Sequence, residues 1–499
     1  MGRITFIKSQ GGLNSQAAGE DHISGLLIYH STLPSGFTAT TRVKEITDVP
    51  AAEALGIVDD KSDETKATGG NVLITELGAV GTTWTVKMDD VTLGTYIVLT
   101  DDDESDVATG LRASINDGTV THGYSAAGSI ANVALTAPAG KGDSINSGSH
   151  LVATNSGAGT STVTQFTGGV DAFFDVIHYH ISEFFRINPT GKLYVGIYST
   201  PVSTYDFTEM TSMQNACTGT LRQLAVYLKD EALSTAHLNT IQAICTALET
   251  NHKPLSVLYA ADITAVTDLT TLSNLKALSD QNVSVVIGQD GANTGAALYT
   301  EKGYSITCLG ATLGAISKAA VHENIGWVSK FNMSGNNELE VPAIANGTLV
   351  NTLSDNAIIA IDTKGYVFLV KHIGISGTYF YDSWTATAST NDYNCIERNR
   401  TMDKAIRNVR MNLLPYLNGP IYVDPTSGKL DASICKNLEA VGNKALEDME
   451  KNGELSGYQT FIDPNQNISS TSNLNIVITN VAVGVSRNIT IKISYTTQI

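Results

Sequence analysis

The final residues of the chain carry its clearest alternation of apolar and polar positions. Side chains two residues apart point to the same face of a β-strand, so a sustained alternation predicts a strand with one apolar face. Such a strand at the end of a chain can join neighbouring chains, because an unpaired strand edge recruits other strands. We therefore expect a C-terminal arm over residues 487–499. Its apolar face consists of Ile489, Ile491, Ile493 and Tyr495.

A shorter alternation opens the chain. Ile4 and Phe6 alternate with Arg3 and Thr5, and residues 9–20 are rich in Gly, Ser, Gln and Asn. One strand followed by a polar tether indicates an N-terminal arm over residues 1–20, and a frayed terminus explains this segment equally well. If it is an arm, we expect Ile4 and Phe6 to share with the C-terminal arm in strand exchange between subunits.

Helical periodicity dominates the segment before the C-terminal arm. Residues 397–417 carry an apolar stripe at helical spacing, and a second helix starts at Asp431, a favourable N-cap residue. Strands are predicted at residues 458–462 and 474–482. We interpret residues 396–486 as a C-terminal αβ domain.

Strands and helices alternate over residues 171–395, which predicts an α/β core. The runs at 255–259 and 283–287 are apolar and β-branched, as in strands covered on both faces. Residues 357–361 and 366–370 read as a hairpin over an Asp-Thr-Lys-Gly turn. Residues 21–64 belong to the same core, which makes the core domain discontinuous.

Residues 65–170 differ from their surroundings. Short strands recur between turns rich in Gly, Ser, Thr and Asn, and Trp84, Val86 and Met88 alternate with polar residues as in a half-buried strand. We predict a β-rich domain inserted into the core. The expected fold class is thus a multidomain α+β/α/β protein, with an α/β core, a β-rich insert, a C-terminal αβ domain and extended terminal arms.

Composition narrows the function. The chain has 499 residues, a formal net charge of −18 and only 16% charged residues. This acidity argues against direct nucleic-acid binding, which requires clustered Lys and Arg. No apolar run reaches the length of a signal peptide or membrane span, and the five cysteines form no CxxC pair. We expect reduced thiols, no membrane insertion, and assembly inside a cell.

Three motifs are candidates for sites of chemistry. The loop 288–295 follows a strand as a phosphate-binding loop does, but it lacks the GxGxxG and P-loop spacings. His178 and His180 would diverge on a helix, and the acidic run 101–106 lacks the EF-hand spacing. We predict an ordinary turn, two separate histidines and a solvated loop that caps a helix with negative charge. No catalytic, cofactor or metal site is expected, and therefore no enzyme.

A basic face on the first helix of the C-terminal domain stands out in so acidic a chain. Arg400, Lys404 and Arg407 are spaced i, i+4 and i+7, away from the apolar stripe. The spacing fits an ordinary solvated helix face, and it equally fits a docking face for an acidic partner.

Three parts of the chain resemble the sheath proteins of contractile phage tails and related contractile injection systems. The resemblance is one of pattern and domain order, and it is strongest at the C-terminus. The stretches that carry it are residues 377–386 followed by 398–405, residues 453–464 followed by 473–495, and, in the insert, residues 106–116 and 133–137.

This resemblance implies a subunit that polymerises helically, as stacked rings that are expected to be hexameric, around an inner tube. Contraction of such a sheath drives the tube through a target envelope. Its C-terminal domain faces the tube, which would assign Arg400, Lys404 and Arg407 to tube contact, and its insert lies outside. The implied partners are other copies of the chain, the inner tail tube protein, and baseplate and tail terminator proteins. The implied location is a virion tail assembled in the host bacterial cytoplasm.

Two other classes remain as alternatives. A surface or appendage adhesin fits the Gly- and Thr-rich insert and predicts a secretion signal. An α/β enzyme that uses the loop 288–295 predicts a catalytic constellation and stabilisation by a nucleotide.

Overall fold

The structure is a computed structural model that describes residues 20–495, with the side chain of Asp230 excepted. The residues predicted to start the N-terminal arm, Ile4 and Phe6, lie outside this range. The described residues form two compact units: one holds residues 20–33, 37–51 and 180–495, and the other holds residues 34–36 and 52–179. We call them the core unit and the inserted unit, and their sheets and helices make a mixed α/β protein.

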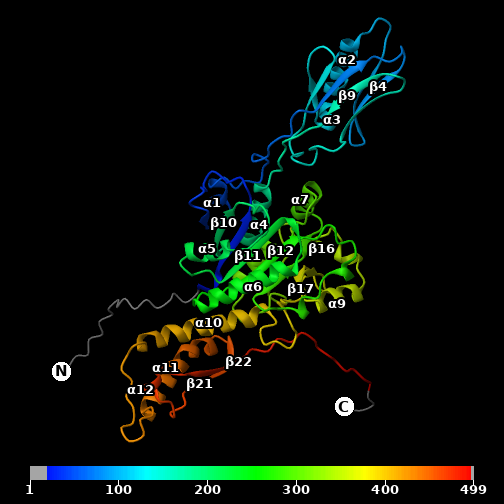
Figure 1. The fold of residues 1–499 in the computed structure, drawn as a ribbon. Helices are drawn as coiled ribbons and strands as arrows, with labels where there is room; N and C mark the ends of the chain where they lie inside the picture. The colour runs from blue at the N-terminus through cyan, green and yellow to red at the C-terminus, as the bar shows by residue number, and fades with distance from the viewer. Residues whose placement is uncertain (1–19, 496–499) are drawn as a thin grey trace, which may run out of the picture. The chain divides into compact units, whose positions relative to one another are not determined.

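A seven-stranded sheet organises the core unit (Figure 1). Six of its strands are parallel and β2 is antiparallel at one edge. All of β1 is buried, as expected for a central strand between two layers of helices. In sheet order the strands are β17 (Tyr366–Val367), β14 (Val283–Val286), β12 (Ser256–Asp262), β11 (Gln223–Ala232), β1 (Ile23–Tyr29), β10 (Lys192–Tyr198) and β2 (Val43–Ile46).

Helices accompany these strands in chain order. They bury Leu238, Ile241 and Cys245 of α6 against apolar strand residues such as Val257 and Val285. Three short two-stranded sheets extend the loops around the main sheet. They pair β13 (Ser279–Asp280) with β20 (Ala386–Thr387), β15 (Gly288–Asp290) with β16 (Pro342–Ile344), and β18 (Leu369–Val370) with β19 (Tyr379–Phe380). The helices are α1 (Val49–Ala54), α4 (Phe174–Ile187), α5 (Glu209–Ala216), α6 (Thr235–Thr250), α7 (Thr294–Lys302), α8 (Leu309–Lys318) and α9 (Asp355–Thr363).

Helix α9 corrects the predicted hairpin at 357–370. The Ser354 side chain accepts a hydrogen bond from the Ala357 amide and caps a helix where a strand was expected. Ile361 is buried and Ile359 is 51% exposed, so the apolar run is amphipathic at helical spacing. The prediction was wrong because a short apolar run fits both periods, and the Ser-Asp start signal decides between them.

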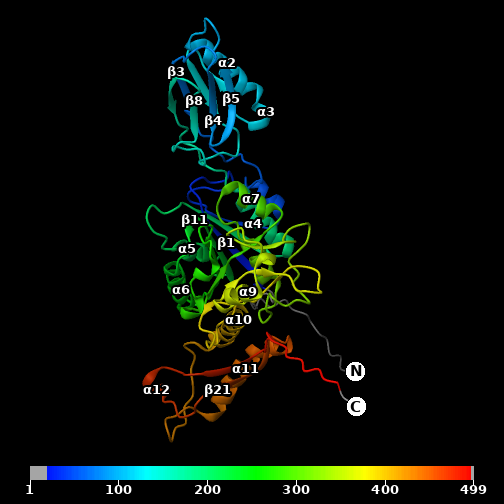
Figure 2. The same cartoon turned by 90° about the vertical axis from the view of Figure 1, so that its right-hand side faces the viewer.

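Two antiparallel strands and two helices follow the core sheet (Figures 1 and 2). Helices α10 (Ile396–Leu413) and α11 (Ala432–Lys451) lie side by side, and β21 (Leu455–Phe461) pairs with β22 (Val477–Ala482). Asp431 caps α11 as predicted, since its side chain accepts from the Ser433 amide. A small core of Ala405, Leu446, Met449 and Leu455 holds one face of the hairpin against the helices.

The predicted terminal strand is not formed within the chain. No strand is assigned to residues 488–495, because no other part of the described chain supplies a hydrogen-bonding partner there. Ile489, Ile491 and Ile493 are 78%, 74% and 91% exposed, and Tyr495 is fully exposed. An apolar alternation with no strand partner among residues 20–495 is thus exposed to solvent.

The inserted unit contains two antiparallel sheets, one ordered β6-β7-β3-β9 and the other β5-β4-β8, around a core of its own that includes Trp84 and Phe166. Figure 2 shows α2 alongside β5. The elements are β3 (Asn71–Glu76), β4 (Thr83–Met88), β5 (Val91–Ile97), α2 (Glu104–Asp117), α3 (Thr119–His122), β6 (Ser125–Ala127), β7 (Asn132–Thr136), β8 (Leu151–Asn155) and β9 (Thr160–Thr164).

Side chains cap the outer edges of both sheets in the inserted unit. The Asn116 amide donates to the Ala126 carbonyl over 2.8 Å and accepts from the Ala126 amide over 2.7 Å. Ser114 accepts from the Thr95 amide in the same way. On the other side of the unit, the Gln165 amide donates to the carbonyl and accepts from the amide of Leu151, and so bridges β9 to β8. Strand edges whose backbone groups are occupied do not recruit strands from other chains.

The Gln165 bridge gives a stability prediction. Replacement by Met keeps the bulk of the side chain but leaves two half-buried backbone groups of Leu151 without partners. We expect Gln165→Met to lower the free energy of unfolding of the inserted unit by about 1–3 kcal/mol. Urea denaturation followed by the fluorescence of the buried Trp84 measures it. Thr162→Val, an exposed change on the same strand, serves as the control, and an equal effect of both variants would refute the bridging role.

Candidate functional site at the roots of the terminal segments

Helix α10 is unusual in how many polar side chains its first half buries. Glu397, Asn399, Arg400 and Asp403 are each no more than 8% exposed. Charged side chains are rarely buried this completely unless they are paired. Arg400 and Glu397 have partners at the two places where the terminal segments join the body of the chain. We call these places the N-terminal root (residues 20–22) and the C-terminal root (Arg487).

At the N-terminal root, one carboxylate meets two cations of α10. The chain forms a short 3₁₀ turn at Glu20–His22 just before β1. Asp21 accepts from Lys404 over 2.8 Å and from Arg407 over 2.6 Å. Burial by itself would raise the pKa of Asp21, but Lys404, Arg407 and Arg400 outweigh it and hold that pKa below its usual value.

Arg400 binds the backbone of the N-terminal root. Its guanidinium is 4% exposed and donates to the Asp21 carbonyl over 3.3 Å. It also donates to the carbonyls of Ala319 and Ala320, at the end of α8, over 3.2–3.4 Å. Burial lowers the pKa of Arg400 to about 10, and it stays charged at neutral pH. The cation thus ties three separate segments of the chain together.

Two further ion pairs complete the N-terminal root. Arg222, at the start of β11, reaches Glu20 over 3.1 Å. Lys404 also bonds Glu454, which precedes β21, over 2.7 Å. Burial alone would lower the pKa of Lys404, but Asp21 and Glu454 raise it above its usual value, so its charge is firmly held.

The structure therefore brings Arg400, Lys404 and Arg407 together, as their spacing predicts, but with partners inside the chain. The solvated-face interpretation does not hold for Arg400, which is buried. The side chains of Lys404 and Arg407 keep 21% and 12% exposure. Contact with a tube stays a prediction, and in this conformation it would compete with Asp21 for the same cations.

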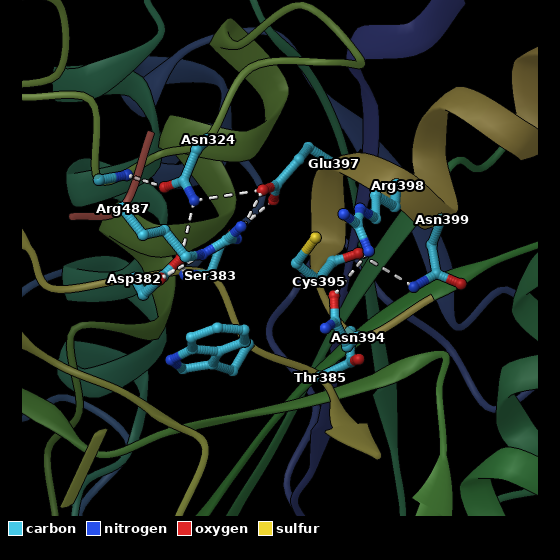
Figure 3. A network of polar contacts seen from close by, with 12 residues as sticks. Asn324, Asp382, Ser383, Thr385, Asn394, Cys395, Glu397, Arg398, Asn399 and Arg487 are labelled. Carbon is cyan, nitrogen blue, oxygen red and sulfur yellow. Dashed lines mark hydrogen bonds and ion pairs between the residues drawn. The ribbon is translucent and has the colours of Figure 1, made fainter. Parts of the chain in front are cut away.

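At the C-terminal root, one cation meets two carboxylates, the reverse of the N-terminal root (Figure 3). Arg487 donates to Asp382 over 2.7 and 3.2 Å and to Glu397 of α10 over 3.0 Å. Its guanidinium also lies 4.6 Å from the ring centre of Trp384, a cation–π distance. Burial would lower the pKa of Arg487, but Asp382 and Glu397 raise it above the ordinary arginine value.

Asn324 locks the two acids of this root together. Its amide donates to Asp382 over 2.7 Å and to Glu397 over 3.2 Å, as Figure 3 shows. Ser383 adds a hydrogen bond to Glu397. Removing one partner from such a buried ionic network costs about 3–5 kcal/mol, because the remaining charge is left uncompensated. The exposed segment at residues 488–495 thus begins directly after Arg487, which this network holds in place.

The other motifs considered in the sequence take up local roles. Asp290 accepts from the amides of Ala292 and Asn293, so the loop 288–295 is closed by its own carboxylate. Asp103 and Asp106 form a capping box at the start of α2, as the acidic run predicts. His178 bonds Glu53 over 3.1 Å.

Two kinds of feature are absent from the described residues. Within residues 20–495, no group of three or more His, Cys, Asp or Glu side chains is arranged to hold a metal ion. No helix in the same range is both long enough and apolar enough to cross a membrane. The five cysteines are free thiols, all of them buried.

Sequence reasoning missed the acids and the arginine that anchor the roots. Glu20 and Asp21 end the polar tether, and Arg487 immediately precedes the apolar alternation. The sequence signal that could have found them is the charge next to each terminal segment, which is negative at residues 20–21 and positive at Arg487. Its partners, Asp382 and Glu397, carry no local pattern that identifies them.

These features define a multidomain α/β protein whose two terminal segments are anchored on one helix. The chain belongs to the DUF2586 family: residues 72–384 match the model of its N-terminal domain, and residues 392–499 match that of its C-terminal domain. The C-terminal match begins just before α10. No curated protein matches the chain.

Chains from two solved assemblies match part of this chain in a structural comparison. One is the anti-feeding prophage baseplate, with 13% identity and a TM-score of 0.42, covering 64% of this chain and 80% of that one. The other is the sheath complex of an extracellular contractile injection system, PVC, in the contracted state. It has 12% identity and a TM-score of 0.41, with the same coverage of 64% and 80%.

Proposed function

We propose that this protein is a structural, non-enzymatic subunit of a contractile tail or injection system, and specifically of its sheath. The sheath subunit polymerises helically around an inner tube and contracts to drive that tube through a target cell envelope. One observation carries the proposal: an alternating apolar segment, at least 74% exposed at each of its large apolar side chains, follows the anchored Arg487. The resemblance of residues 453–464 and 473–495 to sheath proteins supports the same assignment.

The exposed segment is the strand that each subunit donates. Ile489, Ile491 and Ile493 are at least 74% exposed, and Tyr495 is fully exposed. Burying a large apolar side chain contributes about 1.5–3 kcal/mol, so four of them provide a strong drive for association. Because donor and acceptor surfaces differ, the contact is heterologous and builds an open helix instead of a closed dimer.

The β21–β22 hairpin is the acceptor in a neighbouring copy. It is a two-stranded sheet, and β22 pairs only with β21 among the described strands. Asn480 of β22 lies against Met402 of α10, with the amide nitrogen 3.9 Å from the sulfur. Ile406 on the same helix is 37% exposed. A strand added beside β22 would satisfy its free backbone groups and cover this apolar surface.

The remaining parts of the proposal follow from the same assignment. Ile4 and Phe6 donate a second strand, the chains form stacked hexameric rings in a virion tail assembled in the host bacterial cytoplasm, and the inserted unit lies outside. Partners are the inner tail tube, baseplate and terminator proteins. The capped edges of the inserted unit support its exclusion from strand exchange, since its strands offer no free backbone groups at those positions. Tube contact through Arg400, Lys404 and Arg407 requires Asp21 to move aside.

Electron microscopy of the purified protein tests the assignment. We expect hollow tubes with a cogwheel cross-section, and a protein that stays monomeric at high concentration, with or without a tube protein, would refute it.

Cysteine cross-linking tests the acceptor separately. All native cysteines are buried, so Ile491→Cys in one preparation and Thr479→Cys in another provide exposed thiols. A short bismaleimide should join the two in mixed assemblies. Val202→Cys, on a fully exposed side chain, replaces Thr479→Cys as the control. Equal cross-linking to the control would exclude β22 as the acceptor.

A further inference from the structure

We propose that α10 couples the two roots, so that loosening the anchor of one terminal segment loosens the anchor of the other. The inference rests on the proposed function for its purpose, because coupled roots would pass tension from one neighbouring subunit to the next. The coupling itself is a property of the single chain. It is carried by an unbroken series of contacts between Asp21 and Arg487.

The first part of the series runs from the N-terminal root to the end of α8. The Asp21 carbonyl accepts from Arg400, and the same guanidinium donates to the carbonyls of Ala319 and Ala320. Ser317, in the last turn of α8, donates to the His22 carbonyl over 2.7 Å. Residues 317–320 are therefore held to the N-terminal root both through Arg400 and directly.

The second part runs from the same segment to the C-terminal root. The chain turns directly after α8, where the Glu323 side chain accepts from the Ala320 amide over 2.9 Å. The next residue, Asn324, donates to both Asp382 and Glu397, which together hold Arg487. Residues 319–324 thus contact both roots.

Helix α10 provides a second, parallel connection. Glu397 belongs to the C-terminal root and Arg400 to the N-terminal root, and they are three residues apart, so they are neighbours on the helix surface. Lys404 and Arg407 continue the N-terminal root along the next turns of the helix. A helix is a stiff element, and displacement of its first turn moves the turns that follow.

Burial makes these contacts strongly interdependent. Asp382 is 6% exposed and Glu397 is 3% exposed, so loss of the Arg487 charge leaves two carboxylates close together with little solvent. Their repulsion would push the first turn of α10 away from Asp382, and Arg400 would move with it away from Ala319. A contiguous network is a physical route for coupling, and a double-mutant cycle is the measurement that demonstrates it.

Hydrogen exchange on the unassembled chain provides the test. We compare Arg487→Gln, Asp21→Asn and the double variant, and follow backbone exchange by mass spectrometry in residues 20–24 and in residues 382–399. Arg487→Gln should raise exchange in residues 20–24 about fivefold, the change given by a coupling of about 1 kcal/mol. Asp21→Asn should raise it in residues 382–399, and the double variant should fall short of the product of the single effects.

Two further variants make the result decisive. Arg186→Gln removes a comparable bidentate pair with Glu183, at 2.7 and 2.6 Å, that lies off this route. It should leave both roots unchanged. Arg487→Lys keeps the charge and should raise hydrogen exchange at both roots, by less than Arg487→Gln does. It provides the test if Arg487→Gln fails to fold. Exchange that rises only at the altered root would overturn the coupling. Because the measurement uses monomers, absence of tubes would refute the proposed function without touching this result.

Discussion

Deletion of residues 488–499 is expected to leave a folded chain that forms no long tubes. Within the described part of this segment, Ile489, Ile491 and Ile493 contribute almost nothing to the packing of the single chain, because they are 74–91% exposed. Arg487 stays in place and keeps the C-terminal root closed. The fold is therefore preserved while the donated strand is lost. Circular dichroism and thermal denaturation measure the fold, and negative-stain microscopy measures tube length.

A point variant separates the apolar face from the mere length of the segment. Ile491→Thr with Ile493→Thr retains the backbone and its β-propensity but removes the apolar surface, and we expect it to shorten tubes nearly as much as the deletion does. Thr490→Ala changes the opposite face and should assemble normally. Tubes of ordinary length from the deleted chain would show that subunits are joined by another contact.

Much of the core could be predicted because its signals are local. The runs at 255–259 and 283–287 are apolar and β-branched, and they form β12 and β14, buried in the parallel sheet. The N-cap signal also predicted a helix start correctly, at Asp431 of α11. Applied to Ser354, the same rule would have given α9, since the periodicity of five apolar residues cannot distinguish a helix from a strand.

The candidate site was harder to predict because its pairs are distant in sequence. The spacing of Arg400, Lys404 and Arg407 showed that they share a face, but the acid that neutralises them, Asp21, lies 379 residues before Arg400. A basic face on an amphipathic helix looks solvated from the sequence, and only the fold shows that its first turns are buried. Arg487 carries no periodic signal at all. Its role depends on Asp382 and Glu397, which the fold brings to it.

The C-terminal alternation is a case in which the sequence pattern is clear but the single chain does not form the predicted strand. The pattern at Ile489–Tyr495 indicates a strand, yet a strand exists only when another backbone completes its hydrogen bonds. The described part of the chain, residues 20–495, offers residues 488–495 no strand partner, so their exposure is what a donated strand would show before assembly. A pattern in one chain can therefore encode structure that forms only between chains.

A pH dependence of stability is expected from Asp403, on the buried side of α10. Burial raises the pKa of this carboxyl to about 7, and the Glu249 charge adds to the effect. The cations Arg407, Arg222 and Arg400 act in the opposite direction and only partly offset it. The folded chain thus keeps a proton on Asp403 at a pH where the unfolded chain has released it, near an ordinary aspartate value of about 3.9.

The sign of the effect follows from proton binding. Between about pH 4 and pH 7 the folded state holds more protons than the unfolded state, so the free energy of unfolding falls as pH rises through this window. A pKa raised by about three units corresponds to at most about 4 kcal/mol. Below pH 4 the trend reverses, because Asp21, whose pKa is lowered by its cations, begins to lose its charge.

Asp403→Asn should therefore make the decline shallower and leave the chain more stable than the wild type at pH 8, by about 2–4 kcal/mol. Part of the decline stays, because burial also raises the pKa of Asp280, to about 6. Urea denaturation at several values between pH 5 and pH 8 measures this, with the urea slope checked to confirm that the transition stays cooperative. Asp392→Asn, an exposed change near the start of α10, should shift the curve by no more than about 0.5 kcal/mol. If Asp403→Asn declines between pH 5 and pH 8 as steeply as the wild type, Asp403 is ionised in the folded chain throughout that window. The buried first half of α10 would then hold a permanent negative charge near Arg222, Arg400 and Arg407.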